Sequence, residues 1–208
     1  MTHFAFIPLS SLHDRATRWF DRARAALLEA LPCRRGCSAC CYGPFAITVL
    51  DVVALRQGLA ALDPSVRRGL DERARAHATA FEAADPRLRE SPFLDGWNDA
   101  DQDALAERFS ALPCPALDAD GSCLVYAHRP VTCRTMGIPI ESGGTVEGAC
   151  AVQTAVPVVR LSAALREEED RFAEQEAAAL ERLRRAVPLA GDEVWLAYGF
   201  LADRVPVR

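Results

Sequence analysis

The sequence contains no lysine, and all 24 of its basic residues are arginine. A lysine acting as a general base or as a Schiff-base nucleophile is therefore excluded within these 208 residues. The net charge is −5, so the broad basic surface of a nucleic-acid-binding protein is not expected.

Long apolar runs are also missing. No uninterrupted apolar stretch approaches the roughly 20 residues that a membrane-spanning helix needs. The first eight residues lack a basic segment followed by a long apolar one and do not resemble a signal peptide. We therefore expect a cytoplasmic protein without a membrane partner.

Nucleotide-binding signatures are absent as well. The chain holds neither a G-x-G-x-x-G motif nor a P-loop. A nucleotide-like cofactor would have to be held by some other feature of the chain.

What the sequence does contain is helical patterning. Half of the residues are apolar, and many recur at intervals of three and four. The expected helices cover about residues 11–31, 48–62, 63–81, 99–112, 160–187 and 192–203. This pattern predicts a mostly α protein, a single domain over residues 1–208, with at most short β hairpins around an irregular cysteine-rich core.

Several residues mark expected helix starts. Ser11, Thr48, Asp63 (before a proline), Asp99 and Asp192 are the predicted N-terminal caps. Residues 85–98 contain two prolines and a glycine, which predicts an irregular linker. Residues 160–187 have a narrow apolar side, which indicates a solvated outer helix with a possible protein partner as the second interpretation.

The most specific feature is the set of eight cysteines. Four fall within nine residues, and four follow much later: Cys33, Cys37, Cys40, Cys41, Cys114, Cys123, Cys133 and Cys150. In a reducing compartment such a set indicates metal or redox chemistry more often than structural disulfides. We expect the late block, residues 114–150, to fold back onto the early block, residues 33–41, around bound metal.

Thiolates suit both zinc and iron–sulfur centres. The chain has one close pair, Cys37 and Cys40, whereas structural zinc sites usually have two. Scattered late ligands and the Cys114-Pro115 dipeptide favour an iron–sulfur cluster over Zn²⁺. Adjacent Cys40 and Cys41 do not both suit one ion, so one serves a second metal or remains a reactive thiol.

Both cysteine blocks resemble a known family. Cys37-x-x-Cys40-Cys41 and the segment from Cys114 through Cys133 to Cys150 are similar to the YkgJ-type cysteine-cluster family, a zinc- or iron-chelating domain with the pattern C-x-x-C-x-x-C-C. The resemblance implies that the cysteines chelate metal. The flagellin lysine methylases carry a similar domain, which makes a metal-dependent modifying enzyme that uses S-adenosylmethionine the alternative function.

One departure from that pattern concerns Cys33. Three residues separate it from Cys37, and we still expect it to ligate. The resulting C-x-x-x-C-x-x-C spacing is also that of the radical S-adenosylmethionine cluster motif. Ala39 replaces the aromatic residue common in that motif, and no alternating strand–helix series is present, so we treat this likeness as accidental.

Other readings are a metal that only organises the fold, and a thiol redox pair at Cys37 and Cys40. The redox reading leaves six cysteines without a role. Four arginines flank the thiols and are candidates to offset the charge of a cluster: Arg34, Arg35, Arg129 and Arg134. Four histidines are assigned to the surface or the core rather than to metal: His3, His13, His77 and His128.

Overall fold

The computed structural model describes residues 9–26, 36–137, 140–142, 145–147, 162–187 and 190–206. Its elements, in chain order, are α1 (Leu9–Ala26), β1 (Ala46–Thr48), α2 (Val49–Ala60), α3 (Pro64–Ala84), α4 (Arg87–Glu90), α5 (Asp99–Arg108), the 3₁₀ turn η2 (Tyr126–His128), α6 (Val131–Thr135), β2 (Ile140–Ser142), β3 (Thr145–Glu147), α7 (Ala163–Ala186), β4 (Glu193–Trp195) and α8 (Leu196–Gly199). The prediction of a mostly α fold is confirmed. The strands within the described residues form two antiparallel pairs, β1 with β4 and β2 with β3.

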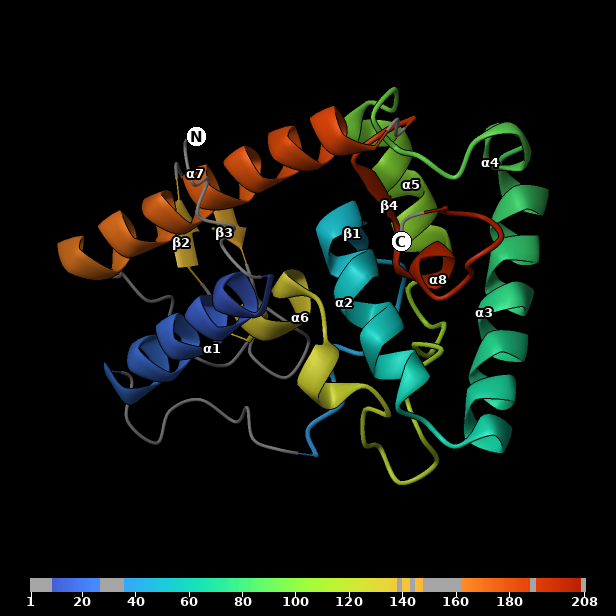
Figure 1. Cartoon of the computed structure of the whole chain (residues 1–208), viewed down its shortest axis with the longest axis horizontal. Helices are drawn as coiled ribbons and strands as arrows, with labels where there is room; N and C mark the ends of the chain where they lie inside the picture. Colours follow the sequence, from blue (N-terminus) through green and yellow to red (C-terminus); the bar gives the residue numbers. More distant parts are fainter. Residues whose placement is uncertain are drawn as a thin grey trace.

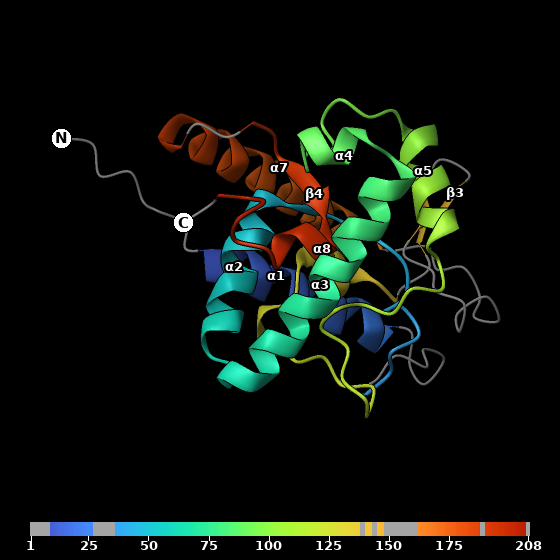
Figure 2. The same ribbon diagram turned by 90° about the vertical axis from the view of Figure 1, so that its right-hand side faces the viewer.

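The helices fall into two groups around the middle of the molecule. α8 lies between α2 and α3 and contacts both, while α1 contacts α6 and α7 (Figure 1). Turned by 90°, the molecule shows α3 crossing the front diagonally, with α4 and α5 near its C-terminal end (Figure 2). α2 belongs to both groups, because it also contacts α1 and α7.

The main hydrophobic core lies among α2, α3 and α8. Its largest fully buried side chains are Tyr198, Phe81, Ile47, Leu55 and Leu70. A second, smaller cluster joins α1 to α6 and α7: Leu12, Ala16, Leu50 and Val131, with Phe172, Ala179, Leu180 and Leu183 packed against it. α7 has no fully buried residue, as expected of an outer helix.

The predicted helix starts are correct at two positions. Asp63 caps α3, and its carboxylate accepts the backbone N–H of Ser65 at 2.8 Å. α2 begins directly after Thr48, although the Thr48 side chain makes no capping hydrogen bond. Asp51 stands in the first turn of α2, and its carboxylate contacts His13 of α1 and Val131 of α6, as described below.

Two other starts are displaced. Ser11 lies inside α1, which already includes Leu9, so it is not the cap. Asn98, not Asp99, caps α5, because its side chain accepts the N–H of Asp101 at 2.8 Å. The predicted end of the first helix near residue 31 lies outside the described residues.

Two ends also differ. α5 stops at Arg108, four residues before the predicted end, and the chain turns there toward the thiols. α7 begins at Ala163 rather than Arg160, because the Ser162 side chain supplies the cap. Residue 160 itself lies outside the described residues.

Residues 85–98 are irregular, as predicted, except for one helical turn, but they do not form a loose linker. This segment contains the short helix α4, and Leu88 is fully buried. The Asp95 carboxylate accepts the backbone N–H of Asp192 at 2.8 Å. Contacts with the C-terminal segment therefore order a stretch whose prolines indicated a linker.

The predicted helix cap at Asp192 is also wrong. A strand, β4, follows it and pairs antiparallel with β1 before the short helix α8 begins. The Asp192 carboxylate instead accepts a hydrogen bond from Nε of Arg184 at 2.8 Å. Strand pairing with a segment almost 150 residues earlier outweighs the local capping signal.

Two short runs in the late cysteine block, residues 123–126 and 138–140, have the composition of small strands; residues 138 and 139 lie outside the described residues. Residues 123–126 form no strand but lead into η2, and Leu117 makes only an isolated bridge with Cys123. The sequence Ser142-Gly143-Gly144 is typical of a turn; residues 143 and 144 lie outside the described residues, and Ser142 of β2 pairs with Thr145 of β3.

Candidate metal centre

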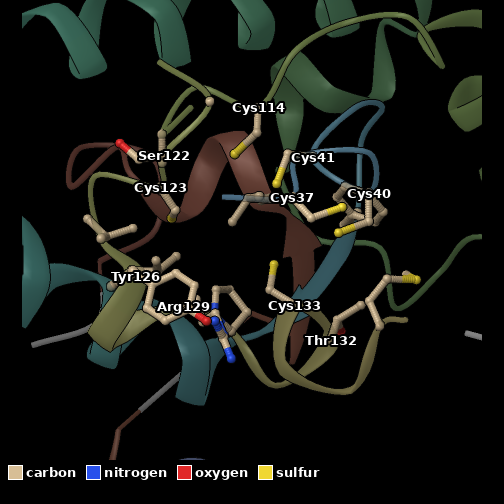
Figure 3. A pocket seen from close by; sticks show the side chains of 18 of the residues that line it. Cys37, Cys40, Cys41, Cys114, Ser122, Cys123, Tyr126, Arg129, Thr132 and Cys133 are labelled. Carbon is tan, nitrogen blue, oxygen red and sulfur yellow. The ribbon is translucent and has the colours of Figure 1, made fainter. Parts of the chain in front are cut away.

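Six of the eight predicted metal ligands lie around one cavity of about 150 Å³: Cys37, Cys40, Cys41, Cys114, Cys123 and Cys133. All six carry free thiols. Figure 3 shows them reaching the cavity from three separate parts of the chain. The other two predicted ligands, Cys33 and Cys150, lie outside the described residues.

The early cysteine loop is joined directly to the late block. The Cys41 carbonyl accepts the backbone N–H of Cys114 at 2.8 Å, and the Leu112 carbonyl accepts that of Gly43 at 2.8 Å. Gly43 has a φ of +88°, a conformation that strongly favours glycine, so the loop can turn toward its partner here. These bonds bring two thiols more than 70 residues apart to one wall of the cavity.

A tight turn brings Cys123 back beside Cys114. The Asp118 N–H donates to the Ser122 carbonyl at 2.8 Å, and the Leu124 N–H donates to the Ala116 carbonyl at 2.9 Å. The sequence Asp118-Ala119-Asp120-Gly121 is typical of a turn, and the structure has one there that returns the chain to the cavity.

Cys133 comes from α6, and a buried carboxylate fixes the start of that helix. Oδ1 of Asp51 accepts the backbone N–H of Val131 at 3.0 Å. The same oxygen lies 2.8 Å from Nε2 of His13 on α1. α1, α2 and α6 therefore meet at one oxygen atom, two residues before the thiol of Cys133.

The two arginines flanking Cys133 have different surroundings. Arg134 is buried and donates hydrogen bonds to the carbonyls of Ala127 at 2.6 Å and Arg129 at 2.9 Å, and to the Thr17 hydroxyl at 2.8 Å. Its role is to hold the loop before α6. Arg129 lines the cavity, so it is the described arginine that can offset charge there. Arg34 and Arg35 lie outside the described residues.

Adjacent Cys40 and Cys41 differ sharply in acidity. The Cys41 thiol hydrogen-bonds Cys40 and lowers the pKa of Cys40 to about 6, an effect that the nearby Arg129 charge assists. The same bond raises the pKa of Cys41. The pair therefore favours one thiolate and one thiol that share a proton, consistent with different roles for two neighbouring cysteines.

The other thiols are held in a drier environment. Burial raises the pKa of Cys114 to about 11 and raises those of Cys123 and Cys133 as well. Each of the three pKa values is raised further by the charge of another cysteine in the set. Mutual repulsion of this kind requires the sulfurs to be close, and a bound cation would relieve it.

The sulfurs surround the cavity rather than converge on a point. Those of Cys41 and Cys114 point into it from one side, and that of Cys133 points in from the opposite side (Figure 3). Within the described ranges, no three cysteine, histidine or carboxylate side chains already form a set that holds one ion. In their donor chemistry, six thiols fit a soft metal centre.

The remaining lining is mostly apolar: Phe45, Leu55, Ala116, Val125, Leu196 and Phe200 contribute to the walls. Tyr126 lines the cavity while 46 % of its surface stays exposed, so it lies where the cavity meets solvent. The site is thus a largely apolar chamber with thiols inside and a tyrosine at the opening.

The sequence pattern of one known family matches residues 32–151, the part of the chain that contains all eight cysteines. That family, CxxCxxCC, is described as "Putative zinc- or iron-chelating domain". The chain belongs to the CxxCxxCC family. No curated protein and no solved structure matches it. The predicted resemblance to a zinc- or iron-chelating domain is confirmed.

The sequence did not predict the buried pair of His13 and Asp51, since His13 was expected only at the surface or in the core. A signal was present for Asp51: it stands in an apolar run between Leu50 and Val52, on a face of α2 that is buried. A carboxylate at such a position needs a buried partner.

No described helix is both long and apolar enough to cross a membrane.

Proposed function

We propose that this CxxCxxCC domain holds a metal centre in the thiol cavity, and that the centre is an iron–sulfur cluster. The ligands would come from the six described cysteines together with Cys33 and Cys150. The observation that carries the proposal is the convergence of six free thiols, from three separate parts of the chain, around one cavity.

Cavity size supports a cluster over a single zinc ion. An apolar cavity of about 150 Å³ holds one benzene-sized group, which is more space than a single metal ion needs. A mononuclear zinc site draws four ligands to within about 2.3 Å of one point. Sulfurs that face each other across a chamber suit a larger group.

The chain itself supplies three things to such a centre. The apolar walls limit the access of water, and the Arg129 guanidinium adds positive charge near Cys40. The hydrogen bonds from Asp51 and Arg134 fix the segment that carries Cys133. A bound cluster would add electron transfer or an open Lewis-acidic iron.

A pair of neighbouring variants tests the ligand assignment. Cys133→Ser removes a thiol from the cavity, whereas Thr132→Ser changes an adjacent lining residue without altering the donor set. We expect Cys133→Ser, purified without oxygen, to lose most of its iron and Thr132→Ser to keep the wild-type amount. Full iron retention by folded Cys133→Ser would contradict the assignment.

A further inference from the structure

The Arg129 side chain carries a polar atom with no partner. Its Nε is buried, and within the described residues it donates no hydrogen bond. The nearby Arg134 differs, since it donates three hydrogen bonds to named acceptors. A buried donor left unpaired costs about 1–3 kcal/mol, and no water-sized ligand reaches this atom, so a ligand in the cavity has to meet the guanidinium through its terminal N–H groups.

Arg129 also lies where a ligand can reach it. It lines the thiol cavity beside Tyr126, and its guanidinium carbon is 4.0 Å from the centre of the Tyr126 ring. The ring is at the opening of the cavity and half exposed. Stacking of this kind leaves the edge of the guanidinium, with its N–H groups, available to an acceptor.

Hydrogen bonds from Arg134 fix the backbone of the loop that carries Arg129. The Arg129 carbonyl accepts a hydrogen bond from Nε of Arg134 at 2.9 Å, and the Ala127 carbonyl accepts another at 2.6 Å. The backbone of the loop is therefore fixed on both sides of residue 128. A preorganised cation loses little freedom when an anion binds.

We propose that Arg129 binds a short aliphatic carboxylate at the Tyr126 end of the thiol cavity, beside the space that the metal centre would occupy, with the carboxylate on the guanidinium and the alkyl chain against the apolar walls. The fork of an arginine matches a carboxylate, and Phe45, Val125 and Phe200 offer the apolar surface. A phosphate dianion is disfavoured, because these walls cannot replace its hydration. The inference rests on the proposed function in one respect: the group next to the bound carboxylate is the proposed metal centre.

The competing role for Arg129 is a counter-charge to the metal centre alone. The charge of Arg129 helps to lower the pKa of Cys40 and opposes the rise in the pKa of Cys123, so Arg129 is close enough to serve that purpose. The two roles differ in one respect. A counter-charge needs no external anion, whereas a binding site discriminates between a carboxylate and its neutral amide.

Calorimetric titration of the anaerobically purified protein tests the proposal, with metal content measured on the same sample. The probes are butyrate, butyramide of nearly the same shape, and inorganic phosphate. We expect butyrate to bind at least tenfold more tightly than either control. Arg129→Gln should weaken butyrate binding at least tenfold, and Arg129→Lys should weaken it less.

Arg108→Gln is the matched control, since Arg108 also lies over an aromatic ring, that of Phe109, but does not line the cavity. It should bind butyrate like the wild type. Equal binding of butyrate and butyramide, no butyrate binding to metal-loaded protein, or unchanged binding by Arg129→Gln would each overturn the carboxylate site. Absence of metal with Arg129-dependent butyrate binding would instead overturn the proposed function and leave this inference standing.

Discussion

Nε2 of His13 lies 2.8 Å from Oδ1 of Asp51, and the two residues are only 5 % and 1 % exposed. The same carboxylate oxygen accepts the N–H of Val131 at the start of α6. This buried junction joins the first helix of the chain to the segment that carries Cys133. Changes at Asp51 should therefore reach both the stability of the fold and the thiol cavity.

Replacing Asp51 with alanine tests the junction. The change leaves the His13 imidazole and the Val131 N–H without their acceptor, so we expect the free energy of unfolding to fall by about 2–5 kcal/mol. Urea unfolding measures it. Asp71→Ala is the control, because Asp71 makes only a long, exposed ion pair with Arg75 and its loss should cost under about 1 kcal/mol. Equal losses in the two variants would refute the structural role of Asp51.

Arg134→Lys should destabilise the loop before α6. A lysine ammonium cannot reproduce the planar fork that reaches the carbonyls of Ala127 and Arg129 together, so we expect a loss of about 1–3 kcal/mol. Arg171→Lys, on the exposed face of α7, should change stability by less than about 0.5 kcal/mol. Thermal unfolding of both variants gives the comparison, and a neutral Arg134→Lys would rule out the proposed clamp.

Glu176 predicts a pH dependence. Burial raises its pKa to about 7, and the charges of Asp51 on α2 and Glu193 on β4 add to the shift. The folded state therefore binds more protons than the unfolded state between the ordinary glutamate pKa, about 4.3, and pH 7. The free energy of unfolding should fall as pH rises through this window, and the loss should be complete above it.

Glu176→Gln should remove that contribution, so its stability should depend less on pH than that of the wild type between pH 5 and 8. Melting temperatures across this range measure the effect. Glu174→Gln, an exposed change on the same helix, should leave the wild-type slope intact. A slope unchanged by Glu176→Gln would assign the pH dependence to other groups.

Two helical glycines should respond to alanine in opposite directions. A Cβ at Gly58 would stand 2.9 Å from Cβ of His128, so Gly58→Ala must push η2 away from α2 and should cost about 1–3 kcal/mol. A Cβ at Gly69 meets only the end of the Arg73 side chain at 3.6 Å. Gly69→Ala should therefore stabilise α3 by about 0.5–1 kcal/mol. Denaturant midpoints of the two variants should move in opposite senses, and a shift in the same direction would contradict this packing.

Local signals predicted much of the helical structure. The Asp63-Pro64 pair marks the start of α3 because the cap and the proline act within one turn. The cysteine spacing predicted a common site because thiols have few other uses in such numbers, and the six described ones do share a cavity. These features depend on neighbours in the sequence or on chemistry that residue type alone reveals.

Long-range pairing explains the failures. The segment around Leu88 looked like a linker because its order comes from Asp192 and the C-terminal strand, about 100 residues away. Asp192 looked like a helix cap because nothing nearby announces that β4 pairs with β1. Likewise, nothing in the sequence around His13 or Asp51 predicts that the two side chains meet. Only the packing of α1 on α2 brings them together.

The most direct test is analysis of iron, zinc and acid-labile sulfide in the wild-type protein purified without oxygen, together with its visible spectrum. The account predicts a brown protein with iron and sulfide in matched amounts. Stoichiometric zinc without sulfide would contradict the cluster and leave a zinc-chelating domain. A folded, metal-free protein in which all eight thiols titrate would contradict the metal centre itself.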